Sequence, residues 1–140
     1  MDSFLDFAGT SIVEADPRRA VAEQKAATEL DNHAAVRHAG ALFAVGYAAS
    51  RALVAAALGP DAEAAELRIL DSETEFARTA VGAVTATAEP AGDWESLLSD
   101  LSESREVELR SSVELRCEEG RTVTTMTVRW GVKVPPRGSS

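Results

Sequence analysis

Residues at the start of one long apolar stretch have properties suited to chemistry on a carbonyl group. Asn32 and His38 precede the stretch, and Gly40 lies at its beginning. A helix that starts here has free N–H groups and the positive end of its dipole at this point, and both stabilise a developing oxyanion. Gly40 lets a ligand approach the backbone closely. Asn32 is suited to position a water molecule or the carbonyl, and the dipole favours a neutral imidazole at His38. The alternative for His38 is a role in capping or packing.

The apolar stretch itself predicts a long buried helix. Between Ala39 and Leu58 the chain has one charged residue, Arg51, and no proline. Its Ala and Leu residues favour helix, and a helix of this length spans about 30 Å. A membrane span has similar length. However, a cation past the middle of such a span costs about 2.5–3.5 kcal/mol, and no Lys/Arg cluster flanks the stretch. We therefore expect the central helix of a soluble domain with no membrane partner.

Composition limits the class of protein. The 140 residues are typical of one domain, and we expect a single domain over residues 1–140, with a short N-terminal helix at residues 1–10 and a loose tail at residues 135–140. Cys117 is the one cysteine, so no internal disulfide can form, and we expect a buried, inert thiol. The acidic N-terminus lacks the features of a signal peptide, which indicates a cytoplasmic protein. The net charge of −9 argues against a nucleic-acid partner, and no metal-ligand spacing is present.

The second half of the chain predicts an antiparallel sheet. Apolar and polar residues alternate strictly over Glu106–Cys117, which is typical of a strand with one buried face. Gly120 ends a short hairpin loop, and the alternation continues over Thr122–Val134. The patterns of Ala65–Leu70 and Val81–Glu89 also indicate strands.

The remaining segments have weaker patterns. Asp71–Thr79 is predicted to be a further strand or the lead-in to one, and Trp94–Ser102 a short amphipathic helix or an ordered connection. Before the long helix, Ser11–Ala15 is predicted to be a short strand. Arg18–Leu30 favours helix by residue propensity alone.

The order of these elements resembles the hotdog fold, an α+β architecture in which a curved antiparallel sheet wraps around one long central helix. Small acyl-thioesterases of the phenylacetate-degradation type, and related uncharacterised proteins, have an asparagine, a histidine six residues later and a small pair ending in glycine where the long helix begins. Asn32, His38, Ala39 and Gly40 match this motif. Phe76–Gly82 resembles a second family motif, namely an aromatic residue, an arginine, a small residue and a glycine-containing strand. The resemblance covers most of the chain.

This resemblance implies an activity and several site residues. It implies action on acyl thioesters of coenzyme A or of a carrier protein, with coenzyme A as part of the substrate and no other cofactor. Phe43 and Phe76 are implied to contact the substrate. Arg78 is implied to meet a coenzyme A phosphate, with an ordinary surface role as the alternative. The resemblance also implies a homodimer or homotetramer, and a strand within Arg18–Leu30 despite its propensity.

Tyr47 departs from the family pattern. Hydrolytic members of the family have a carboxylate nine residues after the histidine, which acts as general base or nucleophile, and this position is Tyr47 here. A tyrosine can donate a hydrogen bond but is a poor base at neutral pH. Asp31 is an alternative acid, and Glu73 or Glu75 could serve from a partner subunit. Three hypotheses remain: an acyl-thioester hydrolase, a domain that binds an acyl chain or another apolar ligand without hydrolysis, and a biosynthetic lyase or cyclase that uses Tyr47 as an acid.

Overall fold

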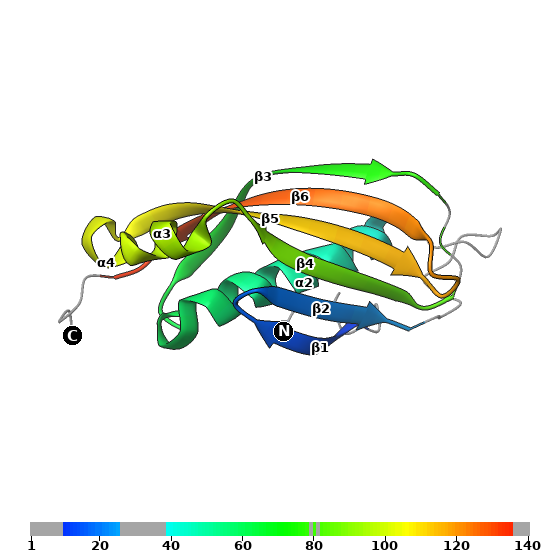
Figure 1. Ribbon diagram of the computed structural model, residues 1–140, viewed down its shortest axis with the longest axis horizontal. Helices are drawn as coiled ribbons and strands as arrows, with labels where there is room; N and C mark the ends of the chain where they lie inside the picture. Colours follow the sequence, from blue (N-terminus) through cyan, green and yellow to red (C-terminus); the bar gives the residue numbers. More distant parts are fainter. Residues whose placement is uncertain (1–9, 26–38, 79, 81, 136–140) are drawn as a thin grey trace.

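One curved sheet and one long helix make up most of the structure, a computed structural model that describes residues 10–25, 39–78, 80 and 82–135. The sheet has six antiparallel strands in the order β1-β2-β4-β5-β6-β3 (Figure 1). In chain order these are β1 (Thr10–Asp16), β2 (Arg19–Gln24), β3 (Glu66–Phe76), β4 (Val84–Ala91), β5 (Glu106–Cys117) and β6 (Thr122–Lys133). The edges of the sheet are β1 and β3.

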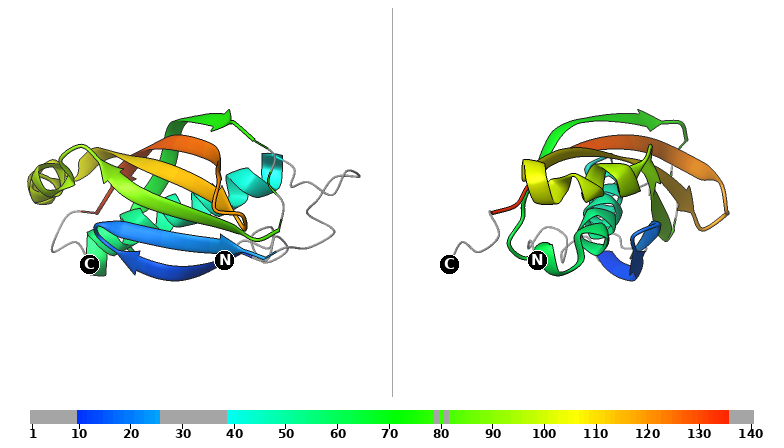
Figure 2. Two further views of the ribbon diagram at one scale, coloured as in Figure 1. Left: turned by 45° about the vertical axis from the view of Figure 1, so that its right-hand side comes forward. Right: turned by 60° about the vertical axis from the view of Figure 1, so that its left-hand side comes forward.

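Helix α2 (Ala39–Leu58) lies along the concave side of this sheet (Figures 1 and 2). It packs mainly on β1, β2, β4 and β5 and more lightly on β6. The arrangement is the hotdog fold that the resemblance implies. The helical span from Gly40 to Asp61, which comprises α2 and the 3₁₀ turn η2 that follows it, is long and apolar enough to cross a membrane, and most of it is buried inside the protein. Its apolar character therefore serves the core of the domain.

Helix α2 and the concave face of β2 to β6 together form a surface that we call the inner surface. Register and burial place these strand residues on the concave face: Ala20, Ala22 and Gln24; Leu67, Ile69, Ser72, Thr74 and Phe76; Val84, Ala86, Ala88 and Pro90; Val107, Leu109, Ser111, Val113, Leu115 and Cys117; Thr124, Met126, Val128, Trp130 and Val132. Among these strand residues there is no Asp, Glu, Lys or Arg.

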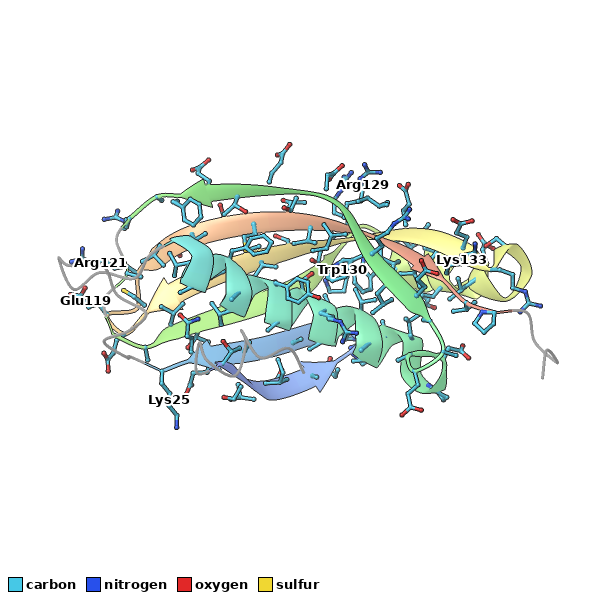
Figure 3. The ribbon with its side chains drawn as sticks, turned by 180° about the vertical axis from the view of Figure 1, so that it is seen from behind. Lys25, Glu119, Arg121, Arg129, Trp130 and Lys133 are labelled. Atoms are coloured by element: carbon cyan, nitrogen blue, oxygen red, sulfur yellow. The ribbon has the colours of Figure 1, made fainter. Side chains whose placement is uncertain are left out.

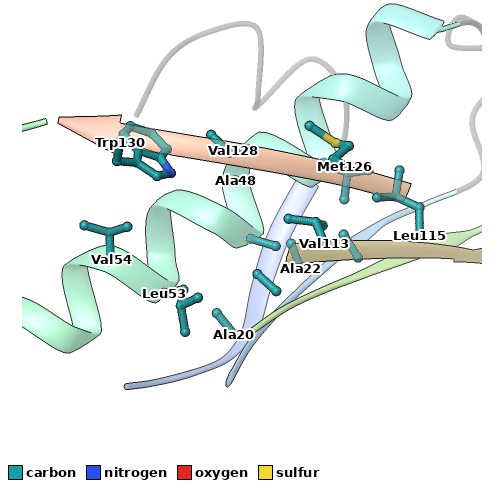
Figure 4. Close-up of a cluster of buried hydrophobic side chains, with 14 of the residues drawn as sticks. Ala20, Ala22, Ala48, Leu53, Val54, Val113, Leu115, Met126, Val128 and Trp130 are labelled. Carbon is teal, nitrogen blue, oxygen red and sulfur yellow. The ribbon is translucent and has the colours of Figure 1, made fainter. Parts of the chain in front are cut away.

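Side-chain size varies across the concave face and sets the position of the helix. The positions on β2 and β4 are mostly alanines, which allow α2 to approach these strands closely (Figure 4). Larger residues on β5 and β6 fill the space on the other side of the helix. At Gly46 an added Cβ would meet the Sδ atom of Met126, so a larger residue at this position would require the Met126 side chain to move.

Several sequence expectations are confirmed and some boundaries change. β5 has the predicted bounds, β6 ends one residue earlier than predicted, and Arg19–Gln24 is a strand, as the resemblance implied and propensity did not. Asp71 and the residues up to Phe76 continue β3 rather than form a second strand, because a bulge between Ile69 and Asp71 shifts the register. Thr10, expected at the end of an N-terminal helix, instead begins β1.

Short helices and connections complete the described chain. Gly59–Asp61 (η2) ends α2, and the predicted amphipathic segment forms α3 (Trp94–Ser99) and α4 (Leu101–Ser104). The Asp93 side chain caps α3 by accepting a hydrogen bond from the Ser96 N–H at 3.1 Å. The rest of the expected N-terminal helix, residues 1–9, and residues 136–140 of the expected tail lie outside the described residues.

Candidate functional site

The candidate site residues divide into two groups. Gly40, Phe43, Tyr47, Phe76 and Arg78 belong to the described chain. The other three candidates, which are Asp31, Asn32 and His38, lie outside the described residues. The described part of the candidate site therefore consists of α2 and the strands that face it.

One side of α2 remains accessible to solvent and has residues suited to binding a ligand. Gly40, Phe43, Tyr47 and Arg51 are three or four residues apart, so they lie along one face of the helix. We call this set the open stripe. Gly40, Phe43 and Arg51 are exposed, and Tyr47 is half-buried. The Phe43 side chain, with 37% of its surface exposed, is unusual for an aromatic residue on a core helix.

Tyr47 lies in a row of aromatic rings. Its ring stacks on that of Phe43, with centroids 6.4 Å apart, and is tilted against that of Trp130, with centroids 5.7 Å apart. Such spacings are favourable for aromatic pairs. Trp130 itself is almost fully buried between the helix and the sheet (Figure 3). The Tyr47 ring thus contacts two other aromatic rings.

A buried hydrogen-bond chain fixes this part of the helix to the sheet. The Trp130 indole N–H donates to Ser50 Oγ at 2.8 Å, and Ser50 Oγ is 2.6 Å from Ser111 Oγ. Both serines are completely buried. The chain joins α2 to β5 and β6 one turn after Tyr47, and it satisfies polar groups that would otherwise be costly to bury.

Edge strand β3 faces the helix with polar and aromatic side chains beyond its bulge. Ser72, Thr74 and Phe76 lie on the concave face, and Phe76 keeps 49% of its surface exposed. Arg78 follows the strand, is exposed, and its backbone N–H donates to Val123 O at 3.2 Å. Glu73 and Glu75 lie on the outer face of the sheet, away from α2.

Gln24 is a site neighbour that the sequence analysis missed. It is completely buried at the end of β2, and its Nε2 donates to Ala41 O in the first turn of α2 at 2.8 Å. This bond fixes the helix start to the sheet. The sequence does contain a signal for this role, because Gln24 is a polar residue in the same alternating register as Ala20 and Ala22. That register can be recognised only after the segment has been assigned as a strand. The buried hydroxyls of Thr10 and Thr124 have no hydrogen-bond partner in the described part of the chain.

Charge is distributed unequally between the two sides of the sheet. On the outer face, Arg129 pairs with Asp71 and donates to Glu108 Oε2 at 3.0 Å. The hydrogen bond from Arg129 lowers the pKa of Asp71 and raises that of Arg129 itself. The hydrogen bond from Thr122, followed by that from Arg116, lowers the pKa of Glu114. By contrast, Arg51 is the one charged residue among the described residues of the inner surface.

Comparison with known proteins agrees with this fold. Residues 3–132 match the model of a family described as a domain of unknown function, DUF4442. The chain belongs to the DUF4442 family. No curated protein shows significant sequence similarity to this member of the family.

Solved structures show the same fold at low sequence identity. A protein of unknown function and probable thioesterase from Pseudomonas aeruginosa has 19% identity and a TM-score of 0.82, over 96% of this chain and 89% of that one. A thioesterase from Staphylococcus aureus has 18% identity and a TM-score of 0.77, over 94% and 99%. A thioesterase family protein from Silicibacter pomeroyi has 17% identity and a TM-score of 0.77, over 96% and 91%. This DUF4442 chain thus has the hotdog fold of thioesterase-like proteins.

The described residues also limit other chemistry. No three His, Cys, Asp or Glu side chains among them are arranged to hold a metal ion. Cys117 is buried on the concave face of β5. The open stripe of α2 and the concave face of β3 carry aromatic rings, hydroxyls and, at Arg51, a guanidinium, and the helix start adds backbone N–H donors. Such groups are suited to binding a carbonyl-containing ligand with an apolar part.

Proposed function

We propose that this protein is a thioesterase-like hotdog protein that acts on acyl thioesters of coenzyme A or of an acyl carrier. The observation that carries the proposal is the accessible first turn of α2 at Gly40, with the exposed aromatic residue Phe43 one turn further along the same face of the helix. Phe76, exposed on the concave face of β3, is proposed as a second contact for the substrate. The helix start supplies N–H donors for a carbonyl oxygen that becomes negative during attack. The aromatic side chains supply apolar contact for the acyl group.

The proposed reaction is hydrolysis. The oxygen of a water molecule bonds to the thioester carbon, the C–S bond breaks, and the departing thiolate takes up a proton. Asn32 and His38 are proposed to position the water and the carbonyl, and Asp31 to accept the proton from the water. Tyr47 is proposed to donate a hydrogen bond rather than act as a base.

The position of Tyr47 receives support from a relative. Two variants of the Staphylococcus aureus thioesterase have solved structures. In one a glutamine is replaced by alanine, and in the other a glutamate fifteen positions later in the chain is replaced by alanine. Asn32 and Tyr47 are separated by the same interval here. This agreement supports the alignment of Tyr47 with a position at which a hydrolytic relative has a carboxylate.

A second candidate is binding of an acyl thioester, or of another apolar ligand, without hydrolysis. The specific observation in its favour is that the inner surface, as far as the structure describes it, has no carboxylate. A lyase or cyclase that uses Tyr47 as an acid remains the third hypothesis and has no separate structural support.

The location and assembly of the protein are also proposals. We propose a cytoplasmic homodimer or homotetramer. Support comes from the outer edge of β3, with which no other strand of the described residues pairs. Arg78 is proposed to bind coenzyme A phosphate, together with Lys25 and Arg121, which lie at the end of the molecule where α2 begins (Figure 3).

Release of free thiol from a panel of acyl-CoAs tests the proposed function. The assay compares native protein with Asp31→Asn, Tyr47→Glu and Tyr47→Gln, where the last variant controls for loss of the ring without gain of a carboxylate. Turnover by native protein that Asp31→Asn abolishes supports hydrolysis. If only Tyr47→Glu cleaves the thioesters, at a rate about 10²–10⁴-fold above that of native protein as expected for a general base, the native protein binds thioesters without hydrolysing them. If native protein neither binds nor cleaves any thioester, the proposal is wrong.

A further inference from the structure

Arg51 is a cation without an acidic neighbour on the inner surface. Helix α2 has no Asp or Glu, and the concave face of β2 to β6 has no charged side chain. The described residues show no ion pair or hydrogen bond from the Arg51 side chain, which is exposed. An unneutralised cation on an otherwise uncharged surface creates a local positive potential, although the chain as a whole has a net charge of −9.

The position of Arg51 relates it to the candidate site. It follows Tyr47 by four residues, so the two side chains are neighbours, about 5–6 Å apart at Cβ, on the open stripe. Gly40 lies eleven residues earlier, which corresponds to about 16 Å along the helix axis. The Cα–Cβ bonds of a helix tilt toward its N-terminus, so the Arg51 side chain leaves the helix in the direction of Gly40.

We propose that Arg51 binds an anionic group of the ligand and thereby selects acyl thioesters whose acyl chain ends in a carboxylate. The inference rests on the proposed function and adds a substrate class to it. With the thioester carbonyl at Gly40, an acyl chain that runs along Phe43 and Tyr47 reaches Arg51 at its far end. A guanidinium binds a carboxylate through paired hydrogen bonds. Lys25 and Arg121 lie at the opposite end, where α2 begins, and are available for carrier phosphates (Figure 3).

The test compares two acyl groups of equal length, suberyl and octanoyl, as thioesters of coenzyme A. Dissociation constants are measured by titration calorimetry while free thiol is monitored. Native protein is expected to bind suberyl-CoA more tightly than octanoyl-CoA. Arg51→Met, which keeps an unbranched side chain but removes the charge, is expected to weaken the binding of suberyl-CoA by about tenfold and to leave the binding of octanoyl-CoA unchanged. Arg51→Lys retains part of the preference.

A control variant and a second carrier identify the source of the effect. Arg68 is exposed on the outer face of β3, and Arg68→Met changes the net charge equally without touching the inner surface, so it is expected to leave both affinities unchanged. N-acetylcysteamine thioesters lack phosphate. The suberyl preference is expected to persist on them. If Arg51→Met instead weakens both coenzyme A thioesters equally and has no effect on N-acetylcysteamine thioesters, Arg51 binds a phosphate and the substrate class is wrong.

Two further outcomes separate this inference from the proposed function. If native protein and Arg51→Met bind both acyl groups with the same affinities, Arg51 has no role in recognition, although the proposed function stands. The same conclusion follows if Arg51→Met only dissociates an oligomer, as measured by sedimentation. If native protein binds none of the thioesters at millimolar concentration, the proposed function is wrong and the Arg51 proposal is wrong with it.

Discussion

The two faces of the sheet differ in how they use polar residues. The outer face has exposed ion pairs, such as that between Asp71 and Arg129, whose partners are also solvated. The inner surface has few polar groups, but several are buried and specifically paired, as in the chain from Trp130 through Ser50 to Ser111. Exposed pairs contribute little to stability, whereas a buried polar group is costly when its partner is removed. Polar residues of the outer face therefore serve mainly solubility, and those of the inner surface fix the geometry of the candidate site.

Trp130 and Arg129 are adjacent on β6 and point to opposite faces of the sheet. Substitutions at these two positions are therefore expected to give the largest difference in the free energy of unfolding. Trp130→Ala removes a buried ring that contacts Tyr47 and is expected to cost about 3–5 kcal/mol in the free energy of unfolding. Arg129→Ala breaks only exposed pairs and is expected to change stability much less. Urea unfolding monitored by circular dichroism measures both. Equal losses would contradict the distinction between the two faces.

The buried hydrogen-bond chain predicts a smaller effect. Ser50→Ala leaves the Trp130 indole N–H without its acceptor in a buried environment and is expected to cost about 1–3 kcal/mol. Ser112→Ala is the matched control, because Ser112 is exposed on the outer face of β5. The same urea titration applies. A loss for Ser112→Ala as large as that for Ser50→Ala would show that burial of the network is not the cause.

Gly40 tests whether the helix start is selected for binding rather than for stability. Its φ is not positive, and alanine is the better helix former, so Gly40→Ala is expected to raise the free energy of unfolding by up to about 1 kcal/mol. The added methyl group lies where the ligand carbonyl is proposed to bind, so affinity for acyl thioesters is expected to fall in the same variant. Unfolding and calorimetric titration are compared. Unchanged affinity would remove Gly40 from the site.

The smallest predicted effect is a dependence of stability on acidic pH. The pKa of Asp71 is lowered from its usual 3.8 and that of Glu114 from its usual 4.5. Each therefore contributes stability that is present above its unfolded-state pKa and is lost as the pH falls through the folded-state pKa. Asp71→Asn is expected to be less stable than native protein at pH 6, with a difference that shrinks below about pH 4. A difference that grows on acidification has the wrong sign for this account.

The fold was predictable from the sequence where one periodicity dominates. The strict alternation over Glu106–Cys117 predicted β5 to the residue, and the apolar composition of Ala39–Leu58 predicted α2. Arg19–Gln24 was not predictable from its own residues, because alanine and glutamate favour helix and only pairing with β1 and β4 makes the segment a strand. The bulge at Leu70 has no sequence signal, so the continuity of β3 was missed.

The candidate site was predictable only in part, for a related reason. The spacing of Phe43 and Tyr47 along a helix implies a shared face, which the structure shows. The contact of Trp130 with Tyr47 and the hydrogen bond from Gln24 to the helix start could not be predicted, because each joins segments that are far apart in the chain. The isolation of Arg51 likewise depends on which strand residues face inward, and this is set by the register of five strands.

The central claim is that the open stripe of α2 binds the acyl thioester, with the carbonyl at the helix start. A crystal structure with the non-hydrolysable thioether analogue 2-oxooctyl-CoA, which keeps the carbonyl but moves it one carbon from the sulfur, tests this directly. The account predicts the ketone oxygen within hydrogen-bond distance of a backbone N–H in the first turn of α2, and the alkyl chain against Phe43 and Tyr47. An analogue bound on the outer face of the sheet, or at the far end of α2 beside Trp94, would contradict it.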